Sequence, residues 1–136
     1  MSAGWGVDIV AISGLAVKVY IAYKEAPDSY QHISDEVESL QALIDKAVQH
    51  IQSTTLDNNS QKEGQKALQG CQNILEDLNS LIEEYNSLAS SSTGQVLKRI
   101  KLGTEDLANL RLRLISNTGL LHSFVQRSVN PTTYYY

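Results

Sequence analysis

Two long stretches of the chain place apolar residues alternately three and four positions apart, the spacing of one narrow face of an α-helix. One stretch begins at Tyr30 and the other at Leu68. Their members are Tyr30, Ile33, Val37, Leu40, Ile44, Ala47 and Ile51, and then Leu68, Cys71, Leu75, Leu78, Ile82, Tyr85 and Ala89. A chain with two such stripes is expected to bury them against other helices.

Flanking polar residues predict where these two helices start and stop. Asp28 is a good N-cap for the first helix, which is expected to end near Ser53, where a polar, turn-prone stretch follows. Ser60 and Glu63 spell the capping box S-x-x-E, so the second helix is expected to start there. Three more apolar residues widen the second stripe, which predicts contact with two neighbours: Ile74, Leu81 and Leu88.

The C-terminal third is expected to hold a short helical segment followed by the last main helix. The small residues 89–94 predict a break, residues 95–102 a short helix, and Gly103 a second interruption before Thr104 caps the last helix. The stripe of that helix consists of Leu107, Leu110, Leu114, Leu121 and Phe124. Its apolar surface is expected to be broadened by Leu112, Ile115, Leu120 and Val125.

Asn117 falls on this last stripe, between Leu114 and Leu121. A polar amide at such a position is expected to border the core, hydrogen-bonded, and to fix the register of the helix. A binding site at Asn117 is the alternative.

Residues 9–23 form a helix of another kind, because 12 of these 15 residues are apolar and the hydrophobic surface goes most of the way round. Such a helix is normally buried at the centre of a domain. It is too short for a membrane span, which needs roughly 20 apolar residues. The alternative is a segment that is buried at rest and enters a bilayer once released.

These patterns predict an all-α fold, an up-and-down bundle of four main helices with the hydrophobic first helix central and a short extra segment before the last. The bundle is expected to cover residues 1–128. Residues 129–136, with Pro131 and the three tyrosines Tyr134, Tyr135 and Tyr136, are expected to be a disordered tail or the boundary to a following region.

Charge is unevenly spread along the chain. Residues 1–93 hold 13 acidic and 5 basic side chains, whereas residues 94–136 hold 2 acidic and 6 basic ones. The basic residues of the C-terminal part are Lys98, Arg99, Lys101, Arg111, Arg113 and Arg127. They either neutralise acidic helices of the same fold or form a patch for anionic phospholipid headgroups.

Composition excludes several functional classes. A net charge of −4 argues against a nucleic-acid module, and one cysteine, Cys71, leaves no disulfide or cysteine cluster for a metal. His32, His50 and His122 show no metal-ligand spacing, and Cys71 falls on a core stripe. We therefore expect no enzyme, no catalytic or metal site, no cofactor and an intracellular location.

Three ordered segments together resemble the N-terminal HeLo-like domain of fungal STAND proteins, the fungal NOD-like receptors. They are GVDIVAISGLAVKVYIAYKEAP at 6–27, ISDEVESL at 33–40 and DLANLRLRLISNTGLL at 106–121. The resemblance covers about residues 5–127. It implies a helical bundle of the HeLo cell-death superfamily, joined in the full-length protein to a nucleotide-binding oligomerisation module.

The resemblance also implies a function, an effector domain that triggers regulated cell death in heterokaryon incompatibility or defence. It would oligomerise in the cytoplasm and reach the membrane through its hydrophobic N-terminal helix. Carried onto this chain, the candidate membrane-active residues are Ile9, Ile12, Leu15, Val19 and Ile21. The candidate headgroup contacts are Lys98, Arg99 and Lys101. A homotypic interaction or autoregulatory module that never engages lipid is the alternative.

Overall fold

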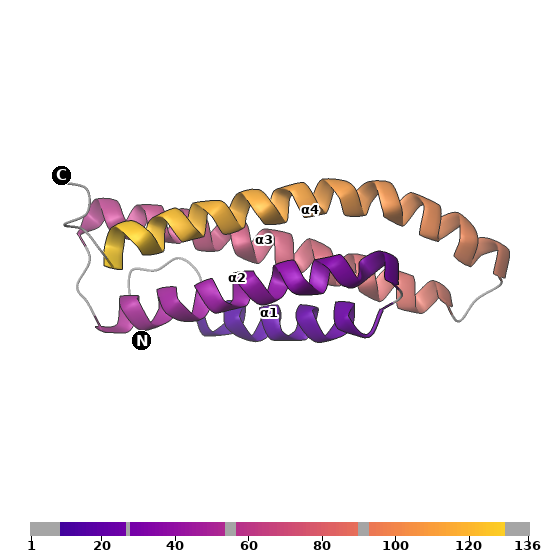
Figure 1. Cartoon of the computed structure of the whole chain (residues 1–136), viewed down its shortest axis with the longest axis horizontal. Coiled ribbons are helices and arrows are strands. Elements are labelled where there is room, and N and C mark those ends of the chain that lie inside the picture. The colour runs from indigo at the N-terminus through magenta and orange to yellow at the C-terminus, as the bar shows by residue number, and fades with distance from the viewer. Residues whose placement is uncertain (1–8, 27, 54–56, 90–92, 130–136) are drawn as a thin grey trace.

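The chain forms four helices that run up and down in turn (Figure 1). They are α1 (Ile9–Lys24), α2 (Asp28–Ser53), α3 (Asn58–Ala89) and α4 (Thr93–Val129). This computed structural model describes the backbone of residues 9–26, 28–53, 57–89 and 93–129, and the side chains of 9–26, 30–51, 57–87 and 107–127. Within these ranges the residues are helical or in turns, so the predicted all-α bundle is confirmed.

Each helix packs mainly against two others. The helix α1 contacts α2 and α3, and α4 also contacts α2 and α3, so α1 and α4 occupy opposite corners of the bundle. The sequence predicted a central first helix, and this prediction is wrong, because α1 lies at a corner of the bundle. Two neighbours cover only one side of a helix, and the apolar residues on its other side stay exposed: Val10, Val17 and Ile21.

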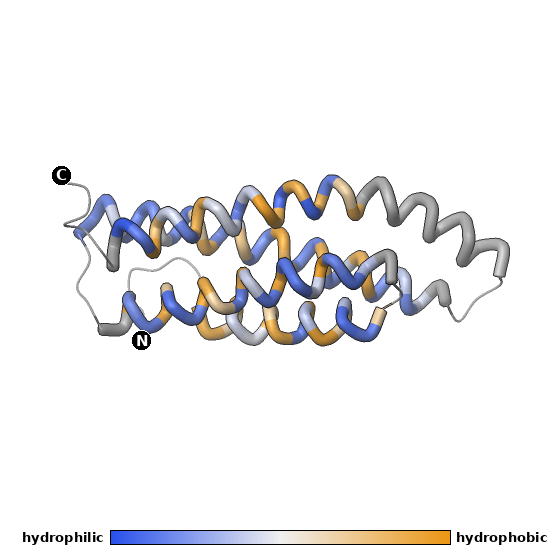
Figure 2. Tube along the Cα trace, in the orientation of Figure 1, coloured by the Kyte–Doolittle hydropathy of each residue, from blue (hydrophilic) through white to orange (hydrophobic). Residues whose placement is uncertain are grey.

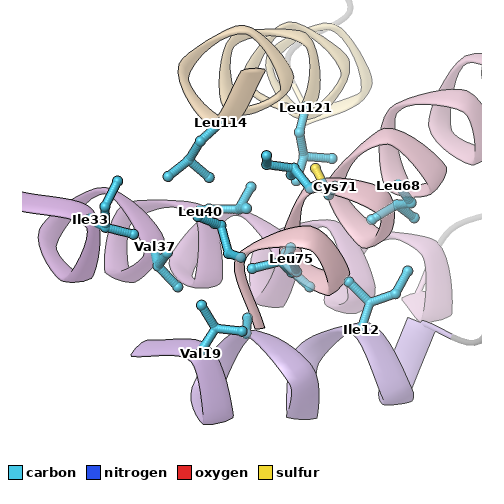
Figure 3. Close-up of a cluster of buried hydrophobic side chains, with 14 of the residues drawn as sticks. Ile12, Val19, Ile33, Val37, Leu40, Leu68, Cys71, Leu75, Leu114 and Leu121 are labelled. Carbon is cyan, nitrogen blue, oxygen red and sulfur yellow. The ribbon is translucent and has the colours of Figure 1, made fainter. Parts of the chain in front are cut away.

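The core is built from the predicted stripes. Hydrophobic positions recur at intervals along the tube, separated by hydrophilic ones (Figure 2). Leu40 of α2 and Leu75 of α3 are fully buried at the centre, where Ile12 and Val19 of α1 approach from one side and Leu114 of α4 from the other (Figure 3). Burial of these side chains contributes roughly 1.5–3 kcal/mol each.

The helix α4 is continuous, so the predicted short segment before it does not exist as a separate element. It runs from Thr93 through Gly103 to Val129. A single glycine costs a helix about 1 kcal/mol relative to alanine, which is too little to break a helix of 37 residues. The predicted end of α2 at Ser53 is confirmed.

The start of α3 lies earlier than the capping box suggested. Asp57 precedes the first helical residue, and its Oδ1 accepts a hydrogen bond from the backbone N–H of Ser60 at 2.7 Å. Asp57 is therefore the N-cap, and Ser60 is the third residue of the first turn. Hydrogen bonds from Ser60, and a weaker one from Asn59, lower the pKa of the Asp57 carboxyl below its ordinary value of 3.8.

We expect Asp57→Ala to lower the melting temperature at pH 7, because the N–H of Ser60 loses its acceptor. The pKa of the Asp57 carboxyl is lower in the folded state than in the unfolded state. The stabilisation by this carboxylate is therefore complete above about pH 4 and is lost as the pH falls through the folded-state pKa. Asp57→Asn should keep the cap and lose this pH dependence. Thermal unfolding followed by circular dichroism at pH 7 and pH 2 measures both effects.

Ser60→Ala is the matched control, because it keeps the backbone N–H that caps the helix and removes only the hydroxyl, whose hydrogen bond lowers the Asp57 pKa less than the backbone bond does. Its melting temperature should fall less than that of Asp57→Ala. A larger fall for Ser60→Ala would place the cap at Ser60 instead.

Candidate functional site

The helix α1 carries apolar residues on two opposite sides. Its inner side is buried against α2 and α3 through Ile9, Ile12, Ala16, Val19 and Tyr23. Its outer side consists of Val10, Gly14, Val17 and Ile21, which are 4, 3 and 4 residues apart and hence share one face. The exposed fractions of Val10, Val17 and Ile21 are 70%, 37% and 48%, and a Cβ at Gly14 would meet open space. These four residues are the α1 outer face.

The inner side is fastened at its C-terminal end by aromatic contacts. The buried hydroxyl of Tyr23 donates a hydrogen bond to the backbone oxygen of Leu78 in α3 at 2.6 Å. The Tyr23 ring packs edge-on against Tyr30 of α2, with ring centroids 6.0 Å apart, and Tyr30 in turn contacts Tyr85 of α3. Burial, and to a smaller extent Tyr30, raises the pKa of the Tyr23 hydroxyl, so it stays a donor at any physiological pH.

Polar contacts at the two sides of α1 lead to the neighbouring helices. Ser13 donates a hydrogen bond to Asp45 of α2 at 2.9 Å, and the Lys18 ammonium lies 3.7 Å from the Glu83 carboxylate of α3. Both contacts are exposed, so each contributes at most a fraction of a kcal/mol. They leave the α1 outer face itself without a charged side chain, and the exposed Lys24, three residues after Ile21, lies at its C-terminal end.

The structure separates the five candidate membrane-active residues. Ile9, Ile12 and Val19 are buried, and Leu15 is half-buried. Among the five, Ile21 alone is exposed. Val10 and Val17, which the sequence analysis did not single out, are exposed beside it. The spacing of Val10, Gly14, Val17 and Ile21 is visible in the sequence, but a helix apolar all round gives no sign of which stripe faces outward.

The basic residues of the C-terminal part fall into two groups. Lys98, Arg99 and Lys101 belong to α4, but their side chains lie outside the described residues. The other three are paired with acidic residues of α2 and α3, as expected if they neutralise the same fold. Arg111 contacts Glu36 at 2.6 Å, Arg113 contacts Asp77 at 2.7 Å and Arg127 contacts Glu63 at 2.8 Å.

Asn117 is half-buried on the side of α4 that packs against α3. Its Nδ2 donates to the backbone oxygen of Arg113 at 2.8 Å, and its Oδ1 faces Gly70 of α3, where a Cβ would overlap it. The Cys71 thiol lies 3.9 Å from the Asn117 backbone oxygen. Glycine at position 70 therefore allows the two helices to approach, and Asn117 fills the space that a side chain there would occupy.

The described residues around α1 combine a buried apolar side, an exposed apolar side and exposed polar contacts between them. Burial raises the pKa of the Cys71 thiol to about 12, so it is not a thiolate nucleophile at neutral pH. No three His, Cys, Asp or Glu residues of the described ranges gather as metal ligands do. No described helix combines the length and the hydropathy that crossing a membrane requires.

Comparison of this chain with models of known protein families, with curated proteins and with solved structures finds no significant match.

Tyr23→Phe removes the hydroxyl that joins α1 to α3 and leaves the ring contacts in place. We expect a loss of about 1 kcal/mol in the free energy of unfolding, and faster amide exchange in α1 than in α2. Chemical denaturation and hydrogen exchange measure the two effects. Tyr20→Phe is the control, because the Tyr20 hydroxyl has no hydrogen bond to any described residue. Equal behaviour of the two variants would contradict a fastening role for Tyr23.

Gly119→Ala, on the open side of α4, should raise the free energy of unfolding by up to about 1 kcal/mol, because alanine favours the helix. Gly70→Ala should lack this gain, because its Cβ forces Asn117 to turn away from Arg113. The double variant Gly70→Ala/Asn117→Ala should recover it. Urea unfolding of the full cycle measures the coupling, and additive effects of the two substitutions would show that the close approach is unimportant.

Proposed function

We propose that this chain is an effector domain of the HeLo-like type, which triggers regulated cell death by self-association and membrane targeting through α1. The proposal rests on the three segments that resemble the N-terminal domains of fungal STAND proteins. In the full-length protein, a downstream nucleotide-binding module would drive the association. The domain would be cytoplasmic at rest and would move to the membrane on activation.

The observation that carries the proposal is the position of α1 at a corner of the bundle, with apolar residues on both its sides. An ordinary bundle helix presents charged residues to solvent, whereas the α1 outer face presents Val10, Val17 and Ile21. With 16 residues, α1 is about 24 Å long. The hydrocarbon core of a bilayer is about 30 Å thick, so the length of α1 exceeds the thickness of one leaflet, about 15 Å. It is therefore long enough to immerse its apolar surface in one leaflet.

Two stages of membrane engagement follow from this geometry. The α1 outer face contacts lipid first, with the bundle intact. Release of α1 from α2 and α3 then adds the inner residues Ile9, Ile12 and Val19, whose loss of burial costs roughly 1.5–3 kcal/mol each. Transfer into hydrocarbon offsets that cost, because lipid replaces the apolar neighbours of α1.

Lys98, Arg99 and Lys101 supply the electrostatic part of the proposal. A basic residue near an anionic surface contributes on the order of 1 kcal/mol. The three together would strengthen binding to anionic vesicles by roughly 100-fold. Arg111, Arg113 and Arg127 contribute less, because each already faces a carboxylate of the bundle.

A homotypic interaction module that does not engage lipid is the second candidate, and exposed residues on α4 favour it. Leu112, Ile115 and Leu120 were expected to widen the core-facing surface of α4, yet their exposed fractions are 68%, 51% and 57%. With Gly119 they form the α4 outer face. Leu112, Ile115 and Gly119 are three and four residues apart and share one side of the helix, and Leu120 lies at its edge. Exposed apolar patches mark protein or membrane contacts.

Co-sedimentation and dye release with anionic and neutral vesicles test the membrane function. We expect binding and leakage with anionic vesicles alone, weakened by added salt because screening reduces the attraction of exposed charges. The variant Lys98→Gln/Arg99→Gln/Lys101→Gln should lose binding by roughly 100-fold. The variant Val10→Gln/Val17→Gln should still bind through its basic residues, but more weakly because the α1 outer face loses apolar contact, and it should release less dye.

The matched control is Lys46→Gln/Lys62→Gln/Lys66→Gln, which removes the same charge from exposed positions of α2 and α3. It should bind vesicles as the unmodified chain does, apart from the effect of net charge. If both triple variants lose the same affinity, net charge explains binding and the headgroup assignment fails. Absence of both binding and leakage would leave the interaction module as the function.

A further inference from the structure

Every large hydrophobic side chain that is exposed within the described ranges lies on α1 or on α4. These helices occupy opposite corners of the bundle, so the α1 outer face and the α4 outer face point to opposite sides of the molecule. The α1 outer face spans the 12 residues 10–21, about 16 Å between its ends, and the α4 outer face spans the 9 residues 112–120, about 12 Å. The two faces are similar in length and in chemistry.

Carboxylates border the α1 outer face on both sides. Asp45 of α2 contacts Ser13, and Glu83 of α3 contacts Lys18, which places these two carboxylates beside α1. Glu38 and Glu76 are exposed and lie seven residues before Asp45 and Glu83, two helical turns along the same sides. These four carboxylates are the acidic rim. Within it, Lys18 offsets one charge, and Lys24 lies at the end of the helix.

Arginines border the α4 outer face on both sides. Arg111 extends toward α2, where it contacts Glu36, and Arg113 extends toward α3, where it contacts Asp77. Both side chains stay nearly half exposed, at 49% and 46%. From residue 107 to residue 127, α4 holds three arginines and no acidic residue. We call Arg111 and Arg113 the basic rim.

These rims decide which faces are compatible. Two α1 outer faces would bring one acidic rim against another. Two α4 outer faces would bring arginines against arginines, with a weaker repulsion because Glu36 and Asp77 offset part of their charge. Like charges at an interface disfavour the pairing, whereas opposite charges favour and orient it. The compatible pairing sets the α1 outer face of one molecule on the α4 outer face of the next.

We propose that the α4 outer face is the docking surface for a second copy of this chain, which covers it with its α1 outer face, the acidic rim of one copy meeting the basic rim of the other. The inference rests on the self-association part of the proposed function. Lipid and a second copy compete for the α1 outer face, so lipid-free association tests this contact separately from the lipid step.

This contact can be repeated from one copy to the next. Because it joins two different faces, each added copy leaves one α1 outer face and one α4 outer face uncovered at the ends, and the assembly stays open unless it closes into a ring. Three large exposed side chains on each face cover far less than the ~800 Å² per partner of a stable interface. The contact between two free copies is therefore weak, and association depends on concentration.

Sedimentation velocity of the full chain without lipid tests the inference. We expect the weight-average mass to rise with concentration up to about 1 mM, and added salt to weaken the association because the rims are exposed. Leu112→Gln/Leu120→Gln on α4 and Val10→Gln/Val17→Gln on α1 should each weaken it by about tenfold or more. Ser39→Gln, an exposed position of α2 that is not three or four residues from Glu38 or Asp45, is the control and should associate as the unmodified chain does.

Mixing the two face variants gives the decisive result. Each should be monomeric alone, while the mixture should form a heterodimer that grows no further, since each partner contributes its one intact face. Association of either variant alone would show that like faces pair, which overturns the proposal. Circular dichroism must show native helicity for both variants, and Glu38→Lys provides a second route, because it should weaken association without touching an apolar residue.

Failure of this inference and failure of the proposed function are distinguishable. A chain that stays monomeric at every concentration overturns the α1–α4 contact, whereas vesicle leakage by the same chain would still support the membrane function. Substitution of Leu112 and Leu120 that abolishes leakage but leaves the lipid-free mass unchanged would assign the α4 outer face to lipid and also overturn the contact.

Discussion

The arrangement of buried and exposed residues in this bundle follows from one constraint: two neighbouring helices can bury only one side of a helix. Each helix packs mainly on two others, which covers one stripe and leaves the opposite side to solvent. For α2 and α3 that division matches the sequence, because apolar residues keep to one stripe and charged residues hold the other side. For α1 and α4 it does not, and the surplus apolar residues become the two outer faces.

The same division explains how much could be predicted from the sequence. The stripes from Tyr30 and from Leu68 identified the buried residues of α2 and α3 because each helix has one apolar side. In α1 apolar residues occupy most of the helix circumference and no polar side stands out. Neither the corner position of α1 nor its exposed side was therefore predictable. On α4, Leu112 and Leu120 look like core residues until the neighbours are placed. Two local signals gave wrong predictions. Gly103 was expected to interrupt the helix but lies within α4, and Ser60 was expected to start α3, which begins earlier, after Asp57.

The charge asymmetry of the chain has a structural counterpart. The described arginines of α4 reach across to carboxylates on α2 and α3, which joins the basic end of the sequence to its acidic part. Exposed pairs of this kind add little stability. Their effect is on the surface: they draw the guanidinium groups sideways, so that apolar side chains occupy the ridge of α4 and charge lies along its edges. The total charge of the chain gives no indication of this arrangement.

The aromatic contacts of α1 are placed unevenly along its length. Tyr23, with its bond to Leu78 and its ring against Tyr30, lies at the last turn, whereas the buried side chains of the first turn are the aliphatic Ile9 and Ile12. A helix anchored at one end detaches from the other. We therefore expect α1 to detach from its N-terminal end first, uncovering Ile9 and Ile12 before Val19. The tyrosine contacts would still hold its C-terminal end, next to α2, while the N-terminal end moves away from the bundle.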